Sequence, residues 1–193
     1  YEERGQYAVL LKPRTDSRDG ERKIQSRMGL SASAEYVDEF LKEISTIWKK
    51  ENTEYRYQGK KVDAVLVDEA QFLSEAEIDT LSDLVDFYNI PVICYGLRTD
   101  FRNRLFPGSR RLMEIADVIE EVPTVCWCGK RAQCNTRYAN GEIVREGAQI
   151  MLGSNESYVA LCRKHYKEGK LWKEAGAENE TSTRRNCKIM EKE

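Results

Sequence analysis

Three continuous apolar runs are spaced along the first hundred residues of the chain. They cover residues 7–11, 62–67 and 91–97. An apolar run without polar alternation predicts a strand that is buried on both faces, as in a parallel sheet. The second run ends in two adjacent carboxylates, Asp68 and Glu69.

Two amphipathic stretches lie between these runs. The clearer one follows Ser74, which forms an S-x-x-E capping box with Glu77, and its apolar residues recur at helical spacing as far as Tyr88. The other covers about residues 34–50. Strands that alternate with helices predict an α/β fold with a parallel sheet and right-handed crossovers.

The chain changes character after residue 122. A polar loop at residues 100–104 and a short helix at about residues 111–118 close the first part. Residues 123–168 contain clustered cysteines and an Asn-Gly pair at residues 140–141, between two strand-like runs, which predicts a type I′ hairpin. Residues 169–193 are polar and charged. We therefore expect an α/β domain over 1–122, a small domain over 123–168 and a C-terminal tail over 169–193.

Composition narrows the possible functions. The 193 residues include 31 Lys and Arg and 33 Asp and Glu, a net charge of −2, which excludes wholesale duplex binding by a basic surface. Hydrophobic residues make up 40% of the chain, which is ample for a globular core. No apolar run approaches the roughly 18 residues of a membrane span, and the start lacks the layout of a signal peptide. Because the chain opens at Tyr1 without a Met, we expect residues upstream of it.

The pair Asp68 and Glu69 is the first candidate for chemistry. In open α/β sheets ligands bind beyond the carboxyl ends of the strands, and an apolar strand that delivers two carboxylates there resembles a Walker B segment. The first carboxylate can hold Mg²⁺ and the second can act as a base. The alternative is a solvated pair that caps the following helix. The usual partner motif, G-x-x-x-x-G-K-S/T, does not occur in the chain.

The cysteines are the second candidate. Cys126-x-Cys128 precedes Cys162-x-x-His165, and four such donors in two pairs suit a closed, structural Zn²⁺ site. Cys134 is a possible rival ligand, and the alternative is a set of free thiols beside a surface histidine. The even number of cysteines could also form disulfides. A chain of this size without an export signal favours a reducing cytosol instead.

The third candidate is the run from Leu152 to Tyr158, which contains Gly153. Glycine lets a backbone approach a ligand closely, and a nearby tyrosine adds a hydroxyl and a ring face. Taken alone, this run is more typical of a plain surface loop with a packed tyrosine.

Taken together, these stretches resemble the cytosolic (type II) thymidine kinase family, from the first residue to about Tyr166. The matching motifs, in chain order, are Lys12-Pro13-x-x-Asp16-x-Arg18, Ser26-Arg27-Met28-Gly29-Leu30, Asp68-Glu69-Ala70-Gln71-Phe72, Gly96-Leu97-x-x-Asp100-Phe101 with Phe106-x-Gly108-Ser109, Cys126-x-Cys128-Gly129, and the run from Gly153-Ser154-Asn155-Glu156-Ser157-Tyr158 to Cys162-Arg163-Lys164-His165. The resemblance implies a P-loop NTPase-like parallel sheet domain followed by a small, zinc-ribbon-like lasso domain. It also implies transfer of the γ-phosphate of ATP to the 5′-hydroxyl of thymidine.

The resemblance assigns roles to individual residues. Glu69 corresponds to the general base, Asp68 to a residue that helps to place Mg²⁺, and Arg18 to a basic position near the phosphates. The family positions that contact the nucleoside correspond to Phe72, Leu97, Phe101, Met151, Gly153 and Tyr158. The structural zinc ligands correspond to Cys126, Cys128, Cys162 and His165.

The resemblance further implies a cytoplasmic homotetramer that dTTP inhibits by feedback, and no membrane or nucleic-acid partner. We expect the P-loop that holds the ATP phosphates to precede Tyr1. Two rival interpretations remain. One is a different P-loop NTPase whose zinc ribbon acts on nucleic acid through a loose basic stripe: Arg131, Arg137, Arg145, Arg163, Lys164 and Lys167. The other is a non-catalytic, zinc-stabilised binding module.

Overall fold

The computed structural model describes residues 1–15, 22–26, 28–47, 55–149 and 157–172. Its helices and strands are η1 (Glu2–Arg4), β1 (Ala8–Lys12), β2 (Lys23–Gln25), β3 (Ser31–Ser33), β4 (Glu35–Tyr36), α1 (Val37–Ile47), β5 (Arg56–Tyr57), β6 (Lys60–Lys61), β7 (Ala64–Val67), η2 (Ala70–Phe72), α2 (Glu75–Tyr88), β8 (Val92–Cys94), α3 (Pro107–Ile115), β9 (Cys134–Ala139), β10 (Glu142–Ile143), β11 (Ser157–Leu161) and α4 (Arg163–Glu168). None of the helices in these ranges is long and apolar enough to cross a membrane.

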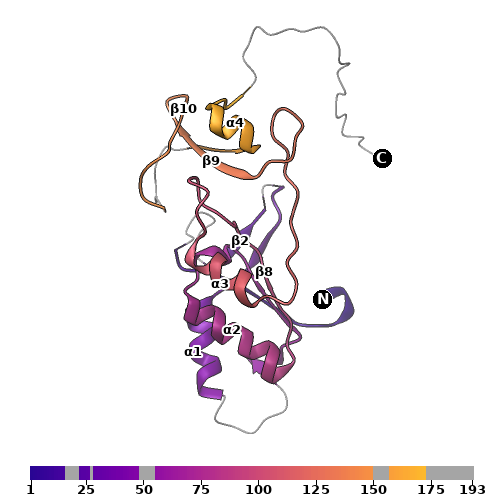
Figure 1. The fold of residues 1–193 in the computed structure, drawn as a ribbon. Helices are drawn as coiled ribbons and strands as arrows, with labels where there is room; N and C mark the ends of the chain where they lie inside the picture. The colour runs from indigo at the N-terminus through magenta and orange to yellow at the C-terminus, as the bar shows by residue number, and fades with distance from the viewer. Residues whose placement is uncertain (16–21, 27, 48–54, 150–156, 173–193) are drawn as a thin grey trace, which may run out of the picture.

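The three predicted apolar strands form a parallel sheet (Figure 1). Its order is β4-β1-β7-β8, and every neighbouring pair is parallel. The strand at residues 7–11 is β1, the strand at 62–67 is β7 and the strand at 91–97 is β8, each shorter or shifted by a residue or more at its ends. The α/β fold with a parallel sheet is confirmed.

The main core lies on one face of this sheet. Helix α1 contributes Phe40 and helix α2 contributes Leu84 to the core, both fully buried, and the two helices contact each other. The opposite face carries Leu10, Leu66 and Ile93 at matching register positions. Leu10 and Leu66 are half-buried and Ile93 is 37% exposed. The same face also carries Lys12 and Ala64, which are fully buried. Within the described sheet, burial on both faces therefore holds for much of β1 and β7 and fails at Ile93 on β8.

The capping box of α2 is present as predicted. The Glu77 amide donates to Ser74 Oγ at 3.3 Å, and the Ser74 amide donates to a Glu77 carboxylate oxygen at 2.8 Å. The helix predicted at about residues 111–118 begins earlier, at Pro107. A proline at the first helical position has a preset φ and no amide that needs a partner, which explains the earlier start.

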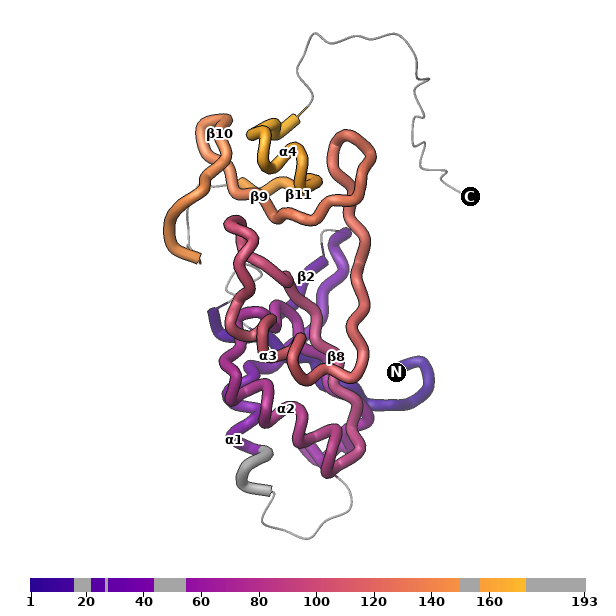
Figure 2. The backbone as a smooth tube through the Cα atoms, viewed as in Figure 1, coloured from indigo at the N-terminus to yellow at the C-terminus, as the bar shows by residue number. Residues whose placement is uncertain are grey.

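A second, smaller core lies beyond the end of α3. After Ile115 the chain runs up one side of the molecule (Figure 2) to a three-stranded sheet of order β10-β9-β11, which is covered by α4. We call residues 124–149 and 157–172 the cysteine module. The predicted hairpin turn joins β9 to β10, and Asn140 and Gly141 both have a positive φ, 51° and 82°. This is the type I′ geometry.

Candidate functional site

The two carboxylates follow β7 at the carboxyl edge of the sheet. The Asp68 amide donates to the Leu11 carbonyl at 2.9 Å, which continues the pairing between β1 and β7. The next residue, Glu69, has φ 52° and ψ 36°, the left-handed conformation that a glutamate rarely adopts. Such a conformation costs on the order of 1–3 kcal/mol and is concentrated at functional sites. Glu69 stands at the N-cap position of η2, but its side chain makes no capping hydrogen bond there, so the carboxylate is not used as a cap.

Gln71 fixes the Glu69 side chain. It is 1% exposed, and its Nε2 donates to Glu69 Oε2 at 2.5 Å. Its Oε1 accepts the Leu97 amide at 3.0 Å. One buried amide group therefore joins the predicted base to a residue that was predicted to wall the nucleoside.

Two glycines allow the backbones to approach closely at this point. A Cβ on Gly96 would lie 2.4 Å from Gln71 Oε1, and a Cβ on Gly108 would lie 2.6 Å from the Ala70 carbonyl oxygen. Gly108 belongs to the first turn of α3, which therefore packs directly on η2. Next to it, Ser109 Oγ donates to the Leu97 carbonyl at 2.7 Å. Both backbone groups of Leu97 are thus held in place.

Four of the predicted nucleoside residues lie within the described residues. Phe72 packs its ring edge to face on Phe106, with centroids 5.7 Å apart, and Leu97 is 42% exposed. Phe101 is 1% exposed, so its ring is a buried support, while Tyr158 on β11 is 50% exposed. The remaining site predictions, Arg18, Met151 and Gly153, lie outside the described residues.

Asp100 anchors the loop that carries Phe101. Its carboxylate is 1% exposed and accepts the amides of Arg102 and Arg104 at 2.8 and 2.9 Å. It also accepts the Arg102 guanidinium and, across to the cysteine module, Gln149 Nε2 at 3.1 Å. Burial alone would raise the pKa of Asp100, but the Arg104 amide, the Arg102 groups and Gln149 lower it below its usual value.

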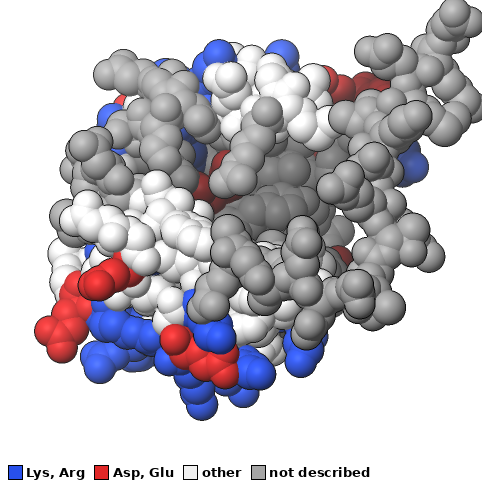
Figure 3. Space-filling model, turned by 90° about the horizontal axis from the view of Figure 1, so that it is seen from above, with Lys and Arg blue, Asp and Glu red and all other residues white. Residues whose placement is uncertain are grey.

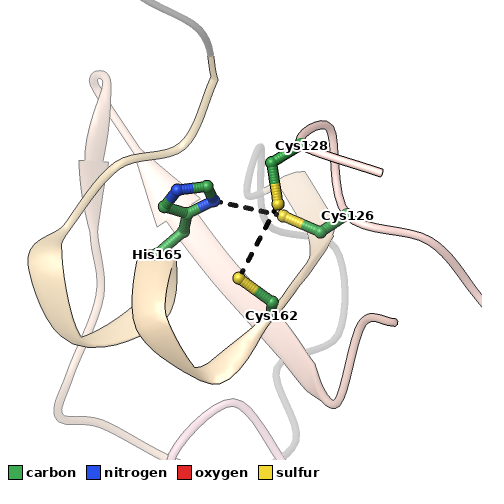
Figure 4. Close-up of side chains that lie close together, drawn as sticks. All are labelled: Cys126, Cys128, Cys162 and His165. Carbon is green, nitrogen blue, oxygen red and sulfur yellow. Dashed lines mark hydrogen bonds between the residues drawn. The ribbon is translucent and has the colours of Figure 1, made fainter. Parts of the chain in front are cut away.

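The four predicted metal ligands lie together in the cysteine module (Figure 4). The sulfur atoms of Cys126, Cys128 and Cys162 and a ring nitrogen of His165 all lie within 4.8 Å of one another. Cys126 Sγ is 3.4 Å from His165 Nδ1, and Cys128 Sγ is 4.0 Å from Cys162 Sγ. Donors at zinc-bond lengths around one tetrahedral ion would be roughly 3.4–3.8 Å apart. Three thiols and one imidazole at this spacing fit a closed Zn²⁺ site.

The surroundings of these ligands favour metal binding. Burial opposes ionisation of Cys126, but amide hydrogen bonds from Cys128 and Cys162 and the His165 ring lower its pKa to about 6. Trp127 stacks on the His165 ring with centroids 4.0 Å apart and planes 5° apart, which fixes the orientation of that ring.

The other cysteines do not join this cluster. Cys134, the possible rival ligand, is buried on β9, where burial raises its pKa. It is not among the four grouped donors. Cys94 packs against the main core, and burial raises its pKa to about 11. Cys187 lies outside the described residues.

Half of the basic stripe that the nucleic-acid interpretation requires is engaged with other residues of this chain, while Arg163, Lys164 and Lys167 are exposed. Arg131 forms an ion pair with Glu121, and Arg137 is 1% exposed. Arg145 lies over the Tyr166 ring at 4.4 Å. On the face shown in Figure 3, described basic and acidic side chains lie beside one another along one edge. These contacts do not favour a nucleic-acid surface.

Sequence reasoning gave no role to three residues that organise the site. Gln71 was part of a quoted motif, Arg137 was counted in the basic stripe, and Gln149 was not considered. The alternation along β9 does not separate an inward arginine from an outward one. The contacts of Gln149 depend on partners more than forty residues away.

Comparison with known proteins gives one consistent result. A sequence model of the family described as "Thymidine kinase" matches residues 1–166. The protein named "Thymidine kinase" from Haemophilus influenzae is 46% identical over 169 residues, which cover 87% of this chain and 84% of that protein. Proteins of the same name from Legionella pneumophila (strain Paris) and Idiomarina loihiensis are 44% and 43% identical. The matched residues make up 90% and 87% of this chain, and 81% and 84% of those two proteins, respectively.

Proposed function

This chain belongs to the thymidine kinase family, and we propose that it transfers the γ-phosphoryl group of ATP to the 5′-hydroxyl of thymidine. The reaction supplies thymidine monophosphate by salvage for DNA synthesis. The observation that carries the proposal is the placement of Glu69, which Gln71 ties to Leu97 at the carboxyl edge of β7.

Glu69 acts as the general base. Phosphoryl transfer depends mainly on positioning and on neutralisation of charge, so one correctly placed carboxylate suffices to take the proton of the 5′-hydroxyl as its oxygen attacks the γ-phosphorus. The left-handed backbone at Glu69 directs this carboxylate, and the hydrogen bond from Gln71 limits its rotation. We expect the thymine ring to pack against Phe72, Leu97 and Tyr158, with Phe101 as a buried support of this wall. Met151 and Gly153 complete the expected contacts.

Asp68 is the residue that would hold Mg²⁺. Carboxylate oxygens are the ligands that this ion prefers, and Asp68 lies at the strand edge where ligands of open α/β sheets bind. When bound, Mg²⁺ neutralises charge on the phosphates of ATP. Arg18 would supply further positive charge there.

Zn²⁺ has a structural role in this proposal. Cys126, Cys128, Cys162 and His165 use all four positions of a tetrahedral ion, which leaves none open for a substrate. The ion would hold the two ends of the cysteine module together. Residues 1–122 and 123–168 would then be the nucleotide-binding and zinc-binding lasso domains, followed by the tail at 169–193.

The setting of the protein is also part of the proposal. We expect a cytoplasmic enzyme that dTTP inhibits, with no membrane or nucleic-acid partner. Its assembly would be a homotetramer, for which exposed apolar residues between α3 and the cysteine module offer surface. Val118, Ile119 and Val122 are 75%, 62% and 80% exposed.

The test replaces the base. The intact protein should transfer labelled phosphate from ATP to thymidine, and Glu69→Gln should lower kcat by roughly 10²–10⁴ with thymidine binding largely kept. Glu75→Gln is the matched control, because Glu75 is an exposed carboxylate in the first turn of α2. Near-normal turnover in Glu69→Gln would exclude Glu69 as the base. Thymidine binding without turnover in the wild type would favour the non-catalytic module.

A further inference from the structure

Arg137 is a charged side chain at the centre of the cysteine module. It lies in the middle of β9 and is 1% exposed, the largest of the fully buried side chains among the described residues. A buried guanidinium is tolerated only where hydrogen bonds and aromatic or charged neighbours replace its hydration. The identity of its partners therefore shows what the residue holds in place.

The hydrogen bonds of Arg137 reach two other segments of the module. Its Nε donates to the Tyr158 hydroxyl at 2.9 Å, across the β9–β11 pair. Nη1 donates to the Ala148 carbonyl at 3.1 Å, and Nη2 donates to the Gln149 carbonyl at 3.3 Å. The planar fork of arginine is thus spread over three acceptors.

The same guanidinium also contacts a residue outside the module. Its Cζ atom lies 3.9 Å from the centroid of the Phe101 ring. Phe101 belongs to the loop after β8. Further hydrogen bonds join this loop to the module. The Tyr166 hydroxyl donates to the Phe101 carbonyl at 2.9 Å, and Gln149 Nε2 donates to Asp100. Arg137 stands where β11, residues 148–149 and the Phe101 loop meet.

We propose that Arg137 is a positioning residue for the nucleoside pocket. It fixes the Phe101 ring and the Tyr158 hydroxyl relative to each other, and so sets the shape of the pocket from the side of the cysteine module. This inference rests on the proposed function, because Phe101 and Tyr158 are walls of the nucleoside site only in a thymidine kinase. Lysine does not reproduce these contacts, since its three donors share one compact nitrogen, whereas the guanidinium places its donors on three nitrogens that reach three residues from a position over the ring.

Arg137→Lys tests the proposal by separating two kinetic constants. A positioning role raises KM for thymidine by about tenfold or more, lowers kcat by less than about threefold and leaves KM for ATP unchanged. A role in stability alone reduces the number of folded molecules, which lowers apparent kcat at an unchanged KM. That second pattern would overturn the proposal.

Arg131→Lys is the matched control. Arg131 belongs to the same module, but its side chain is 58% exposed and pairs with Glu121 at the surface. We expect wild-type values of both constants from this variant. A rise in thymidine KM equal to that of Arg137→Lys would mean that the effect is not specific to residue 137.

Hydrogen exchange of the free protein tests the geometry without reference to activity. Arg137→Lys should speed amide exchange at residues 100–105 and 157–161, and Arg131→Lys should not. If Arg137→Lys does not fold, Tyr158→Phe serves in its place: it removes one acceptor and should speed exchange in the Phe101 loop through Arg137. Unchanged exchange in the folded variants would overturn the positioning role. If the variants show these changes in exchange but the wild type does not phosphorylate thymidine, the proposed function is refuted and the positioning role is not.

Discussion

Replacement of Gln71 by Leu should damage stability and catalysis together. Leucine has nearly the same size as glutamine, so the cavity that Gln71 fills stays filled. The variant loses the hydrogen bond to Glu69 Oε2 and leaves the Leu97 amide without its acceptor. Stability and catalysis depend on one side chain here because that side chain is both buried and bound to the proposed base.

The size of the effect follows from these two bonds. A hydrogen bond to a charged group contributes about 1.5–3 kcal/mol, and an unsatisfied buried amide costs about 1–3 kcal/mol. Burial of an apolar group in place of an amide offsets part of this, which leaves a net loss of roughly 2–4 kcal/mol. For a chain of this size the melting temperature should fall by roughly 5–15 °C. Release of the Glu69 carboxylate should lower kcat by about 10–10².

The assay combines thermal unfolding with steady-state kinetics at a temperature where the variant is folded. Gln133→Leu is the control, because Gln133 is exposed and far from the sheet edge. A lower melting temperature with normal kcat would show that Gln71 stabilises the fold but does not position Glu69 for catalysis. An unchanged melting temperature would refute both hydrogen bonds.

Two further predictions concern the cysteine module and its partner loop. Cys162→Ser should reduce zinc from about one ion per chain to near zero and raise KM for thymidine, while the core around α1 and α2 stays folded; metal analysis, kinetics and circular dichroism check this. Asp100→Asn should destabilise the protein at pH 7 and progressively less as the pH falls below the ordinary carboxyl pKa. The lowered pKa of Asp100 means that its contribution is complete above the ordinary carboxyl pKa and is lost as pH falls through the folded value. A stability difference between variant and wild type that does not shrink as the pH falls below the ordinary carboxyl pKa would contradict this.

The elements that sequence could predict are those whose signal is local. Ser74 and Glu77 are three residues apart, so the sequence alone identifies both residues of their capping box. The turn at Asn140 needs only two residues that accept a positive φ. The metal cluster consists of two local pairs, Cys126 with Cys128 and Cys162 with His165, and the chain has one histidine, so few other assignments were possible.

The elements that sequence missed depend on distant partners. Strands β2 and β3 are short, and most of their residues are exposed, so they show no apolar alternation. The β5–β6 hairpin turns at Gln58 and Gly59, which both have a positive φ, yet glutamine is not a usual signal for such a turn. The exposure of Ile93 on β8 could not be predicted from the sequence, because buried and exposed positions of the three strands carry the same kinds of apolar residue.

The small size of the second core bears on the stability of the proposed nucleoside site. Three of its seven buried residues are cysteines, so it has little apolar surface with which to fix its strands. A metal ion would brace it at Cys126 and Cys162, and the Phe101 loop braces it from the other side through Arg137 and Tyr166. Tyr158 lies on the strand between these two supports. Loss of either support should therefore weaken binding of thymidine before that of ATP, because Asp68 and Glu69 belong to the first core and depend on neither.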